Sequence, residues 1–176
     1  MTQHTVVPCT FERHADAILD IFNDAILHST ALYDYKPRTR QNMVAWFEAK
    51  RAGGFPVIGI EDAHGTLVAF GSYGTFRAYP AYKYTVEHSV YVHEKHRGHG
   101  LGRRVMQELI AAAQAQDLHA MVGAIDATNA GSIALHTGLG FKLVGTLPQV
   151  GFKFGRWLDL VFYQRLLDTP AQPVDG

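Results

Sequence analysis

The chain has 176 residues, and its 16 lysines and arginines balance 16 aspartates and glutamates, so its formal net charge is zero. Hydrophobic residues make up 47% of it, which suits one packed core and would leave two domains cramped. The zero charge excludes the broad basic surface of a non-specific nucleic-acid binder. We therefore expect a small-molecule enzyme or an interaction domain, with no nucleic-acid partner.

The first half of the chain alternates between strand and helix patterns. A β-prone run at 5–11 precedes a segment at 15–27 whose apolar residues recur at helical spacing. A second helix is expected at 39–51, ended by two glycines. Apolar runs at 56–61 and 66–73 are joined by Asp-Ala-His-Gly, which has the chemistry of a hairpin turn.

The second half continues the alternation and ends in a polar tail. We expect strands at 84–92, 119–125, 141–146 and 158–165, a helix around 105–113 and a short one at 132–137. This order predicts a single mixed α/β domain at 1–167, with an antiparallel N-terminal part and a strand-helix-strand crossover. The proline-containing tail, 168–176, is expected to be disordered.

Cysteine and hydropathy patterns indicate the compartment. The single cysteine, Cys9, excludes an intramolecular disulfide and a cysteine-based zinc site. The histidines form no zinc-binding pattern, so we assign no metal. No secretory signal is evident, and no window approaches the ~18 apolar residues of a membrane span. We expect a cytoplasmic protein that contacts no membrane.

The most informative segment is a glycine loop at 97–104, Arg-Gly-His-Gly-Leu-Gly-Arg-Arg, between an expected strand and helix. Backbone N–H groups, a helix N-terminus and three arginines together suit a pyrophosphate. A P-loop is excluded because no Gly-Lys dipeptide occurs in the chain. A Rossmann loop would need its third glycine where Arg103 stands. The alternative is a glycine-rich turn that only connects strand to helix.

Two motifs resemble those of the GNAT superfamily of N-acetyltransferases. The first is Arg97-x-x-Gly100-x-Gly102, similar to that superfamily's acetyl-CoA pyrophosphate motif. The second is similar to a signature that usually reads Asn, Ala, Leu-Tyr, Gly-Phe: Asn129-x-x-Ser132-x-x-Leu135-His136-x-x-Leu139-Gly140-Phe141. Either motif alone is weak, but together and in this order they are specific. The resemblance implies a central mixed, mostly antiparallel sheet flanked by helices.

Three further features resemble the phosphinothricin and methionine sulfoximine N-acetyltransferase branch. These are the strand Tyr84–Val92, the histidine at 136 where most of the superfamily has tyrosine, and the C-terminal segment Gly151–Asp159. The resemblance covers roughly residues 5–167. It implies acetyl-CoA as cosubstrate, a small amine as acceptor, a homodimer and a role in detoxification or amino-acid damage.

The branch assigns its catalytic roles to two side chains found here. Glu87 would be the general base that deprotonates the amine, directly or through a water, since free amines are ammonium ions at neutral pH. Its alternative is a solvent-facing glutamate or a partner of Lys83. His136 would be the second catalytic residue, because an imidazole titrates near neutrality. Its alternative is a buried structural histidine.

The cofactor and substrate contacts are also implied by the resemblance. The pantetheine arm would lie along the strand like an added strand, with a backbone N–H able to stabilise the oxyanion. Asn129 would contact the pantetheine, cap the short helix, or both. The expected cofactor-binding residues are Val90, Tyr91, Val92, Arg97, Gly98, His99, Gly100, Leu101, Gly102, Arg103, Asn129 and Ser132.

An amino-acid substrate with a carboxylate calls for arginine or lysine partners. Arg77 is our first candidate, and Lys153 and Arg156 are the second. These two could reach the site of their own subunit or that of a neighbouring one. Aromatic residues could wall the pocket or simply pack on the core. The expected substrate-binding residues are Arg77, Tyr82, Glu87, His88, Ser89, Lys153 and Arg156.

The sequence thus predicts an acetyl-CoA-dependent N-acetyltransferase acting on L-methionine sulfoximine, methionine sulfone, phosphinothricin or a related amino acid. Two alternatives stay open. One is an N-acetyltransferase for another amine, such as a polyamine, an aminoglycoside or a protein N-terminus. The other is a non-catalytic acyl-CoA-binding module, which the presence of both Glu87 and His136 argues against.

Overall fold

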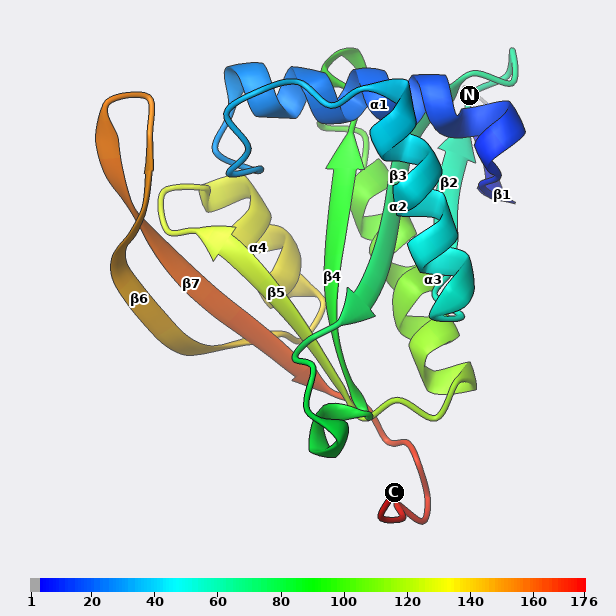
Figure 1. Cartoon of the computed structure of the whole chain (residues 1–176), viewed down its shortest axis with the longest axis vertical. Helices are drawn as coiled ribbons and strands as arrows, with labels where there is room; N and C mark the ends of the chain where they lie inside the picture. The colour runs from blue at the N-terminus through cyan, green and yellow to red at the C-terminus, as the bar shows by residue number, and fades with distance from the viewer. Residues whose placement is uncertain (1–3) are drawn as a thin grey trace. The chain divides into compact units, whose positions relative to one another are not determined.

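The structure is a computed structural model that describes residues 4–176 (Figure 1). Its strands hydrogen-bond in the order β1-β2-β3-β4-β5-β7-β6. The expected mixed α/β class is confirmed. The elements are β1 (Thr5–Pro8), α1 (Phe11–His28), α2 (Arg40–Ala52), β2 (Val57–Glu61), β3 (Leu67–Thr75), β4 (Thr85–Val92), α3 (Leu101–Ala115), β5 (Ala120–Asp126), α4 (Ala130–Gly138), β6 (Lys142–Lys153) and β7 (Arg156–Leu166).

The chain divides into two compact units. One holds the residues up to Gly74 together with Ser89–Leu109, and the other holds Thr75–His88 together with Ile110–Gly176. Strand β4 and helix α3 contribute residues to both. No helix within residues 4–176 is long and apolar enough to cross a membrane.

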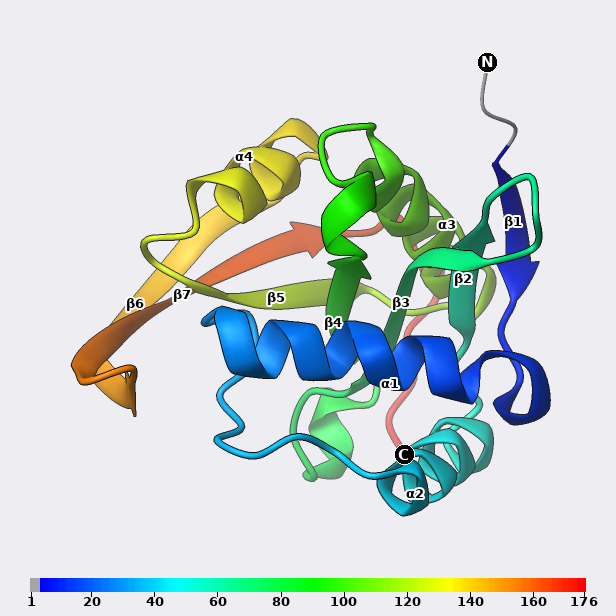
Figure 2. The ribbon, with the colours of Figure 1, turned by 90° about the horizontal axis from the view of Figure 1, so that it is seen from above.

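The first unit is built on the antiparallel strands β1, β2 and β3 and on helices α1 and α2. Helix α1 begins earlier than its apolar pattern indicates, because the hydroxyl of Thr10 accepts a hydrogen bond from the N–H of Arg13 and caps the helix. Helix α2 lies beside the N-terminal half of α1 (Figures 1 and 2). At the centre of this core, the ring of Phe22 meets Trp46, Phe70 and Tyr91 edge-on.

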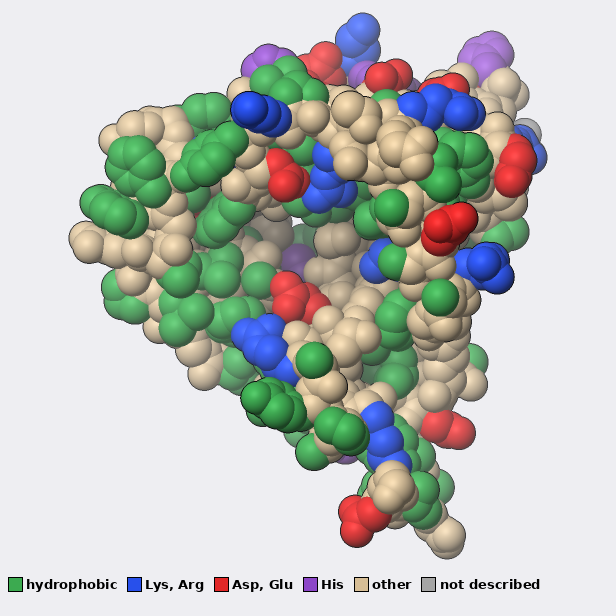
Figure 3. Space-filling model, viewed as in Figure 1, with side chains coloured by type: hydrophobic (Ala, Val, Ile, Leu, Met, Phe, Trp, Pro, Cys, Tyr) green, Lys and Arg blue, Asp and Glu red, His purple; other side chains and the backbone are tan. Residues whose placement is uncertain are grey.

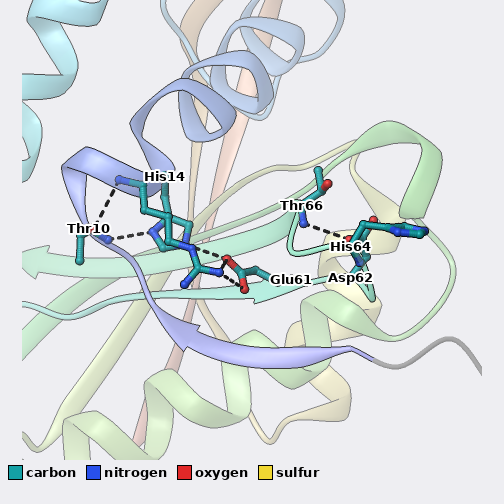
Figure 4. Close-up of polar contacts among 7 residues, drawn as sticks. Thr10, His14, Glu61, Asp62, His64 and Thr66 are labelled. Carbon is teal, nitrogen blue, oxygen red and sulfur yellow. Dashed lines mark hydrogen bonds and ion pairs between the residues drawn. The ribbon is translucent and has the colours of Figure 1, made fainter.

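A buried carboxylate ties α1 to β2. Glu61 accepts hydrogen bonds from the guanidinium of Arg13 at 2.8 Å and from Nε2 of His14 at 3.1 Å. The N–H of Thr10 donates to Nδ1 of His14, so the ring proton of His14 lies on Nε2, facing Glu61 (Figure 4). Nearby, Asp62 accepts from the N–H groups of His64 and Thr66 and forms the expected hairpin turn between β2 and β3.

The second unit is built around β5, which runs parallel to β4 and antiparallel to β7. Strands β6 and β7 form a long hairpin closed by a two-residue turn, Phe154-Gly155, in which φ is +52° and +73°. Strand β6 is twice as long as its pattern predicts. The register of its pairing with β7 shifts at Leu147/Gly151, so the alternation of apolar residues is lost where the strand continues.

The residues after β7 make several hydrogen bonds within the second unit. The hydroxyl of Thr169 donates to the carbonyl of Leu118, and the N–H of Val174 donates to the hydroxyl of Tyr84 at 3.1 Å. The ring of His119 donates from Nδ1 to the carbonyl of Thr169 at 2.8 Å. The domain boundary at 167 and the disorder of 168–176 stay predictions.

Candidate active site

The glycine loop lies in the first unit, between β4 and α3. Gly98 and Gly100 have φ of +80° and +74°, which side chains rarely adopt, and a Cβ at either would meet nothing within 4 Å. Glycine is therefore required here for backbone conformation, and the space beside the loop is open. The first turn of α3 starts directly afterwards, at Leu101, so its N–H groups point out of the helix end. The loop has the features expected of an anion-binding cradle.

The arginine that opens the loop is held by two contacts. Nε of Arg97 donates to the carbonyl of Val92 at 3.2 Å, and its Nη2 lies 3.4 Å from a carboxylate oxygen of Asp24 on α1. His28 bonds to the other oxygen of Asp24 at 3.0 Å. The Arg97 side chain is more than half exposed, so its charge is available to an anion at the loop.

The end of strand β4 belongs to the same unit. Val90, Tyr91 and Val92 are all partly buried, and Tyr91 stacks on Phe70 with its ring centroid 5.4 Å away. The side chain of Tyr91 thus packs on the core of the first unit.

In the second unit, β4 carries the acidic residue expected as the base. Glu87 is half-buried, and its burial raises the pKa of its carboxyl, while the positive charge of Arg77 lowers it. Arg77 is exposed, donates to the carbonyl of Phe76 at 2.8 Å and lies over that residue's ring. The ring of Phe76 packs edge-on against Tyr82 at 5.6 Å. The structure thus places Glu87, Arg77 and Tyr82 in one unit.

Helix α4 is capped by the asparagine of the second motif. Oδ1 of Asn129 accepts a hydrogen bond from the N–H of Ser132 at 3.0 Å. The capping role expected for this asparagine is therefore present. Contact with a pantetheine stays a prediction.

His136, from the same helix, is buried against His88 of β4. Their Nε2 atoms are 2.8 Å apart, and the two rings stack with centroids at 5.0 Å. His136 Nδ1 lies 2.7 Å from the carbonyl of Ser132, while Nδ1 of His88 has no hydrogen-bond partner among residues 4–176. Burial lowers the pKa of both rings, that of His88 to about 3 with a further contribution from His136; backbone bonds with Val122 and Ser132 oppose these shifts at His88 and His136 without cancelling them. Both rings are therefore neutral near pH 7.

Lys153 and Arg156 flank the turn of the β6–β7 hairpin. Lys153 is buried, with its ammonium 4.9 Å from the ring centre of Phe154. Arg156 is exposed, and its guanidinium lies 3.9 Å from the buried carboxylate of Asp126 on β5. Among residues 4–176, no group of three His, Cys, Asp or Glu side chains could hold a metal ion.

Comparison with known proteins decides the family. The model of the acetyltransferase (GNAT) family matches residues 16–141, which lie in both units. The chain belongs to the GNAT family of acetyltransferases. This GNAT enzyme is 49% identical to the L-methionine sulfoximine/L-methionine sulfone acetyltransferase of Pseudomonas paraeruginosa, over 86% of this chain and 88% of that protein.

Two further relatives place it among the same acetyltransferases. An L-methionine sulfoximine/L-methionine sulfone acetyltransferase of Salmonella typhimurium is 45% identical over 89% of this chain and 91% of its own length. The crystal structure of a phosphinothricin acetyltransferase from Sinorhizobium meliloti, in complex with acetyl-CoA, has a TM-score of 0.93. That structure is 31% identical and covers 98% of this chain and 94% of its own. The predicted membership of this branch is confirmed.

Sequence reasoning missed one feature of this GNAT site. The sequence predicts substrate binding for His88 and catalysis for His136, whereas the structure buries both rings, joins them and places Gly123 of β5 against both. A weak signal existed, because neighbouring residues of a strand point to opposite faces, so His88 could not share the surroundings of Glu87. The contact itself links residues 48 positions apart, which spacing rules do not reach.

Proposed function

We propose that this enzyme transfers acetyl from acetyl-CoA to the α-amine of a small amino-acid-like substrate such as L-methionine sulfoximine, methionine sulfone or phosphinothricin. The observation that carries the proposal is the identity of 45% and 49%, over most of the chain, with two enzymes named for the first two of these substrates. The site residues discussed above are compatible with this activity.

Acetyl-CoA fits the cradle on the chain's own geometry, since the loop is open beside Gly98 and Gly100 and precedes a helix N-terminus. When bound, acetyl-CoA supplies a thioester-activated acetyl group. The backbone of the loop and the exposed charge of Arg97 would bind its pyrophosphate. The residues we assign to this binding are Val90, Tyr91, Val92, Arg97, Gly98, His99, Gly100, Leu101, Gly102, Arg103, Asn129 and Ser132.

Glu87 is the proposed general base. Its pKa is raised by burial, which makes its carboxylate a stronger proton acceptor than an exposed glutamate. It would remove a proton from the substrate ammonium, directly or through a water, so that the amine lone pair can attack the acetyl carbonyl. The C–N bond then forms as the C–S bond breaks, and the second proton lost by the nitrogen ends on the departing thiolate. Both ring nitrogens of His136 lie within hydrogen-bond distance of protein atoms, one of His88 and one of Ser132. This supports a structural role for His136 over a catalytic one.

Arg77 is the proposed partner of the substrate carboxylate. Its guanidinium is exposed and close enough to Glu87 to lower the pKa of that carboxyl. A carboxylate bound at Arg77 would therefore lie near the base. Tyr82 and Ser89 complete the proposed substrate-binding set, with Lys153 and Arg156 acting from the hairpin.

The β6–β7 hairpin supports the proposal of a homodimer. Apolar side chains gather over this hairpin in Figure 3, where they are green on the left. Exposed large apolar side chains in such number on one hairpin are typical of an interaction surface, so a second copy is the proposed cover. The residues, each at least 43% exposed, are Leu143, Val144, Leu147, Val150, Phe152, Phe154, Trp157 and Leu166. The cytoplasmic location stays a prediction.

The proposal is tested by measuring CoA release by mass spectrometry with four amines side by side: L-methionine sulfoximine, L-phosphinothricin, spermidine and a peptide amine. Mass detection avoids a thiol reagent, with which Cys9 could react. Selective turnover of the first two supports the proposal. Preference for spermidine or the peptide would instead support another amine, and acetyl-CoA binding without any turnover would support a binding module.

A further inference from the structure

The two buried histidines form a hydrogen-bond chain with one direction. A carbonyl oxygen only accepts, so the 2.7 Å contact between Nδ1 of His136 and the Ser132 carbonyl requires the proton on Nδ1. In the neutral ring, Nε2 of His136 then carries no proton and offers a free lone pair. At 2.8 Å, two lone pairs would repel, so Nε2 of His88 carries the proton and donates it to Nε2 of His136.

The surroundings hold both rings in this arrangement. His88 and His136 are 6% and 2% exposed. Phe141 packs against both, with ring centroids at 5.2 Å in each case. A Cβ added to Gly123 would lie 2.9 Å from Cε1 of His88 and 3.0 Å from Nε2 of His136. The pair therefore fits only because residue 123 has no side chain.

The chain of bonds links the strand of the base to the helix of the second motif. His88 directly follows Glu87, and neighbouring strand residues point to opposite faces. The side chain of His88 is thus bonded to α4, while the side chain of Glu87, on the opposite face of β4, is the proposed base. Fixing His88 to His136 fixes the backbone that carries Glu87.

We infer that His88 is a positioning residue: it donates to His136, holds that ring as its Nδ1–H tautomer, and anchors the segment of β4 that carries Glu87. His136 then has no N–H left for a departing thiolate. The kinetic consequence of this inference rests on the proposed function, whereas the tautomer does not.

The tautomer is measured by NMR on protein with 15N-labelled histidine, from the couplings between ring carbon-bound protons and ring nitrogens. His136 is assigned from the signals lost in His136→Asn. We expect its Nδ1 to be protonated and its Nε2 to be unprotonated and hydrogen-bonded. A proton on Nε2 of His136 in the wild-type enzyme would overturn the inference, whether or not the enzyme acetylates any tested amine.

Two variants test the positioning role. His88→Phe keeps a ring but removes the donor, and His88→Gln retains an N–H donor at similar reach. We expect His88→Phe to lose about tenfold to 100-fold in kcat, the range found when the partners that orient metal-ligating histidines are removed. Acetyl-CoA affinity should stay unchanged, and His88→Gln should recover most of the lost kcat.

Each outcome decides the question. A folded His88→Phe with wild-type kcat and an unchanged His136 spectrum would overturn the inference. If His88→Phe does not fold, the spectra of the wild type and of His88→Gln decide it, because both must show the same tautomer of His136. Absence of turnover in the wild type would overturn the proposed function and leave the tautomer measurement valid.

Discussion

Replacing Gly123 by alanine tests the packing of the histidine pair. The added Cβ would lie 2.9 Å, 3.0 Å and 3.1 Å from three ring atoms of His88 and His136, well inside ordinary van der Waals contact. Neither ring can move freely, because His136 is bonded at both nitrogens and His88 is buried. Overpacking of this kind costs about 1–3 kcal/mol. We therefore expect Gly123→Ala to destabilise the protein by that amount.

The assay is urea unfolding followed by circular dichroism, with Tm as a second readout. For a protein of this size, each kcal/mol lowers Tm by about 2–4 °C. The matched control is Gly145→Ala in β6, where a Cβ meets nothing within 4 Å. The control should keep wild-type stability or gain slightly, since alanine restricts the unfolded chain more than glycine does. Equal stability of Gly123→Ala and Gly145→Ala would refute the described packing.

Three other variants probe the cradle, the substrate site and the hairpin. Gly100→Ala forces a side chain into a backbone with φ of +74°, at a cost of about 1–2 kcal/mol. Calorimetry should show about tenfold weaker binding of acetyl-CoA. An unchanged affinity would argue against the cradle. Arg77→Ala should raise the KM for the amino acid and, by removing a positive charge, raise the pKa of Glu87 further; an unchanged KM contradicts the anchoring role. Trp157→Asp changes a hairpin side chain that is 60% exposed, and light scattering should show that this variant is a monomer. The control Val174→Asp, at a tail residue that is 65% exposed, should remain a dimer. A wild-type enzyme that is already monomeric would contradict the homodimer.

The positions of most elements could be predicted because their causes are local. Helix α2 begins at Arg40 since Thr39 and Asn42 form a reciprocal cap, and both residues are visible in the sequence. The hairpin turn after β2 follows in the same way from Asp62. Patterns of this kind involve residues within four positions of one another. Periodicity and capping rules therefore reach them.

The features that escaped prediction depend on contacts distant in sequence. The bond between His88 and His136 arises because parallel pairing places β5 next to β4, which no spacing of histidines reveals. The length of β6 likewise follows from β7, whose pairing extends the strand past a shift in register. The ion pair of Arg97 with Asp24 joins the loop to α1, 73 residues earlier.

The central claim is that Glu87 acts as the base for acetyl transfer, and Glu87→Gln tests it most directly. Acetyl transfer to L-methionine sulfoximine should be followed by mass spectrometry over a range of pH, with acetyl-CoA affinity measured on the same samples. Because ionised Glu87 is the active form, wild-type kcat/KM should rise with pH through the raised pKa of this carboxyl. Glu87→Gln should bind acetyl-CoA normally, lose about 10²–10⁴ in kcat and lose that pH dependence. A variant with wild-type turnover and the same pH profile would contradict the account.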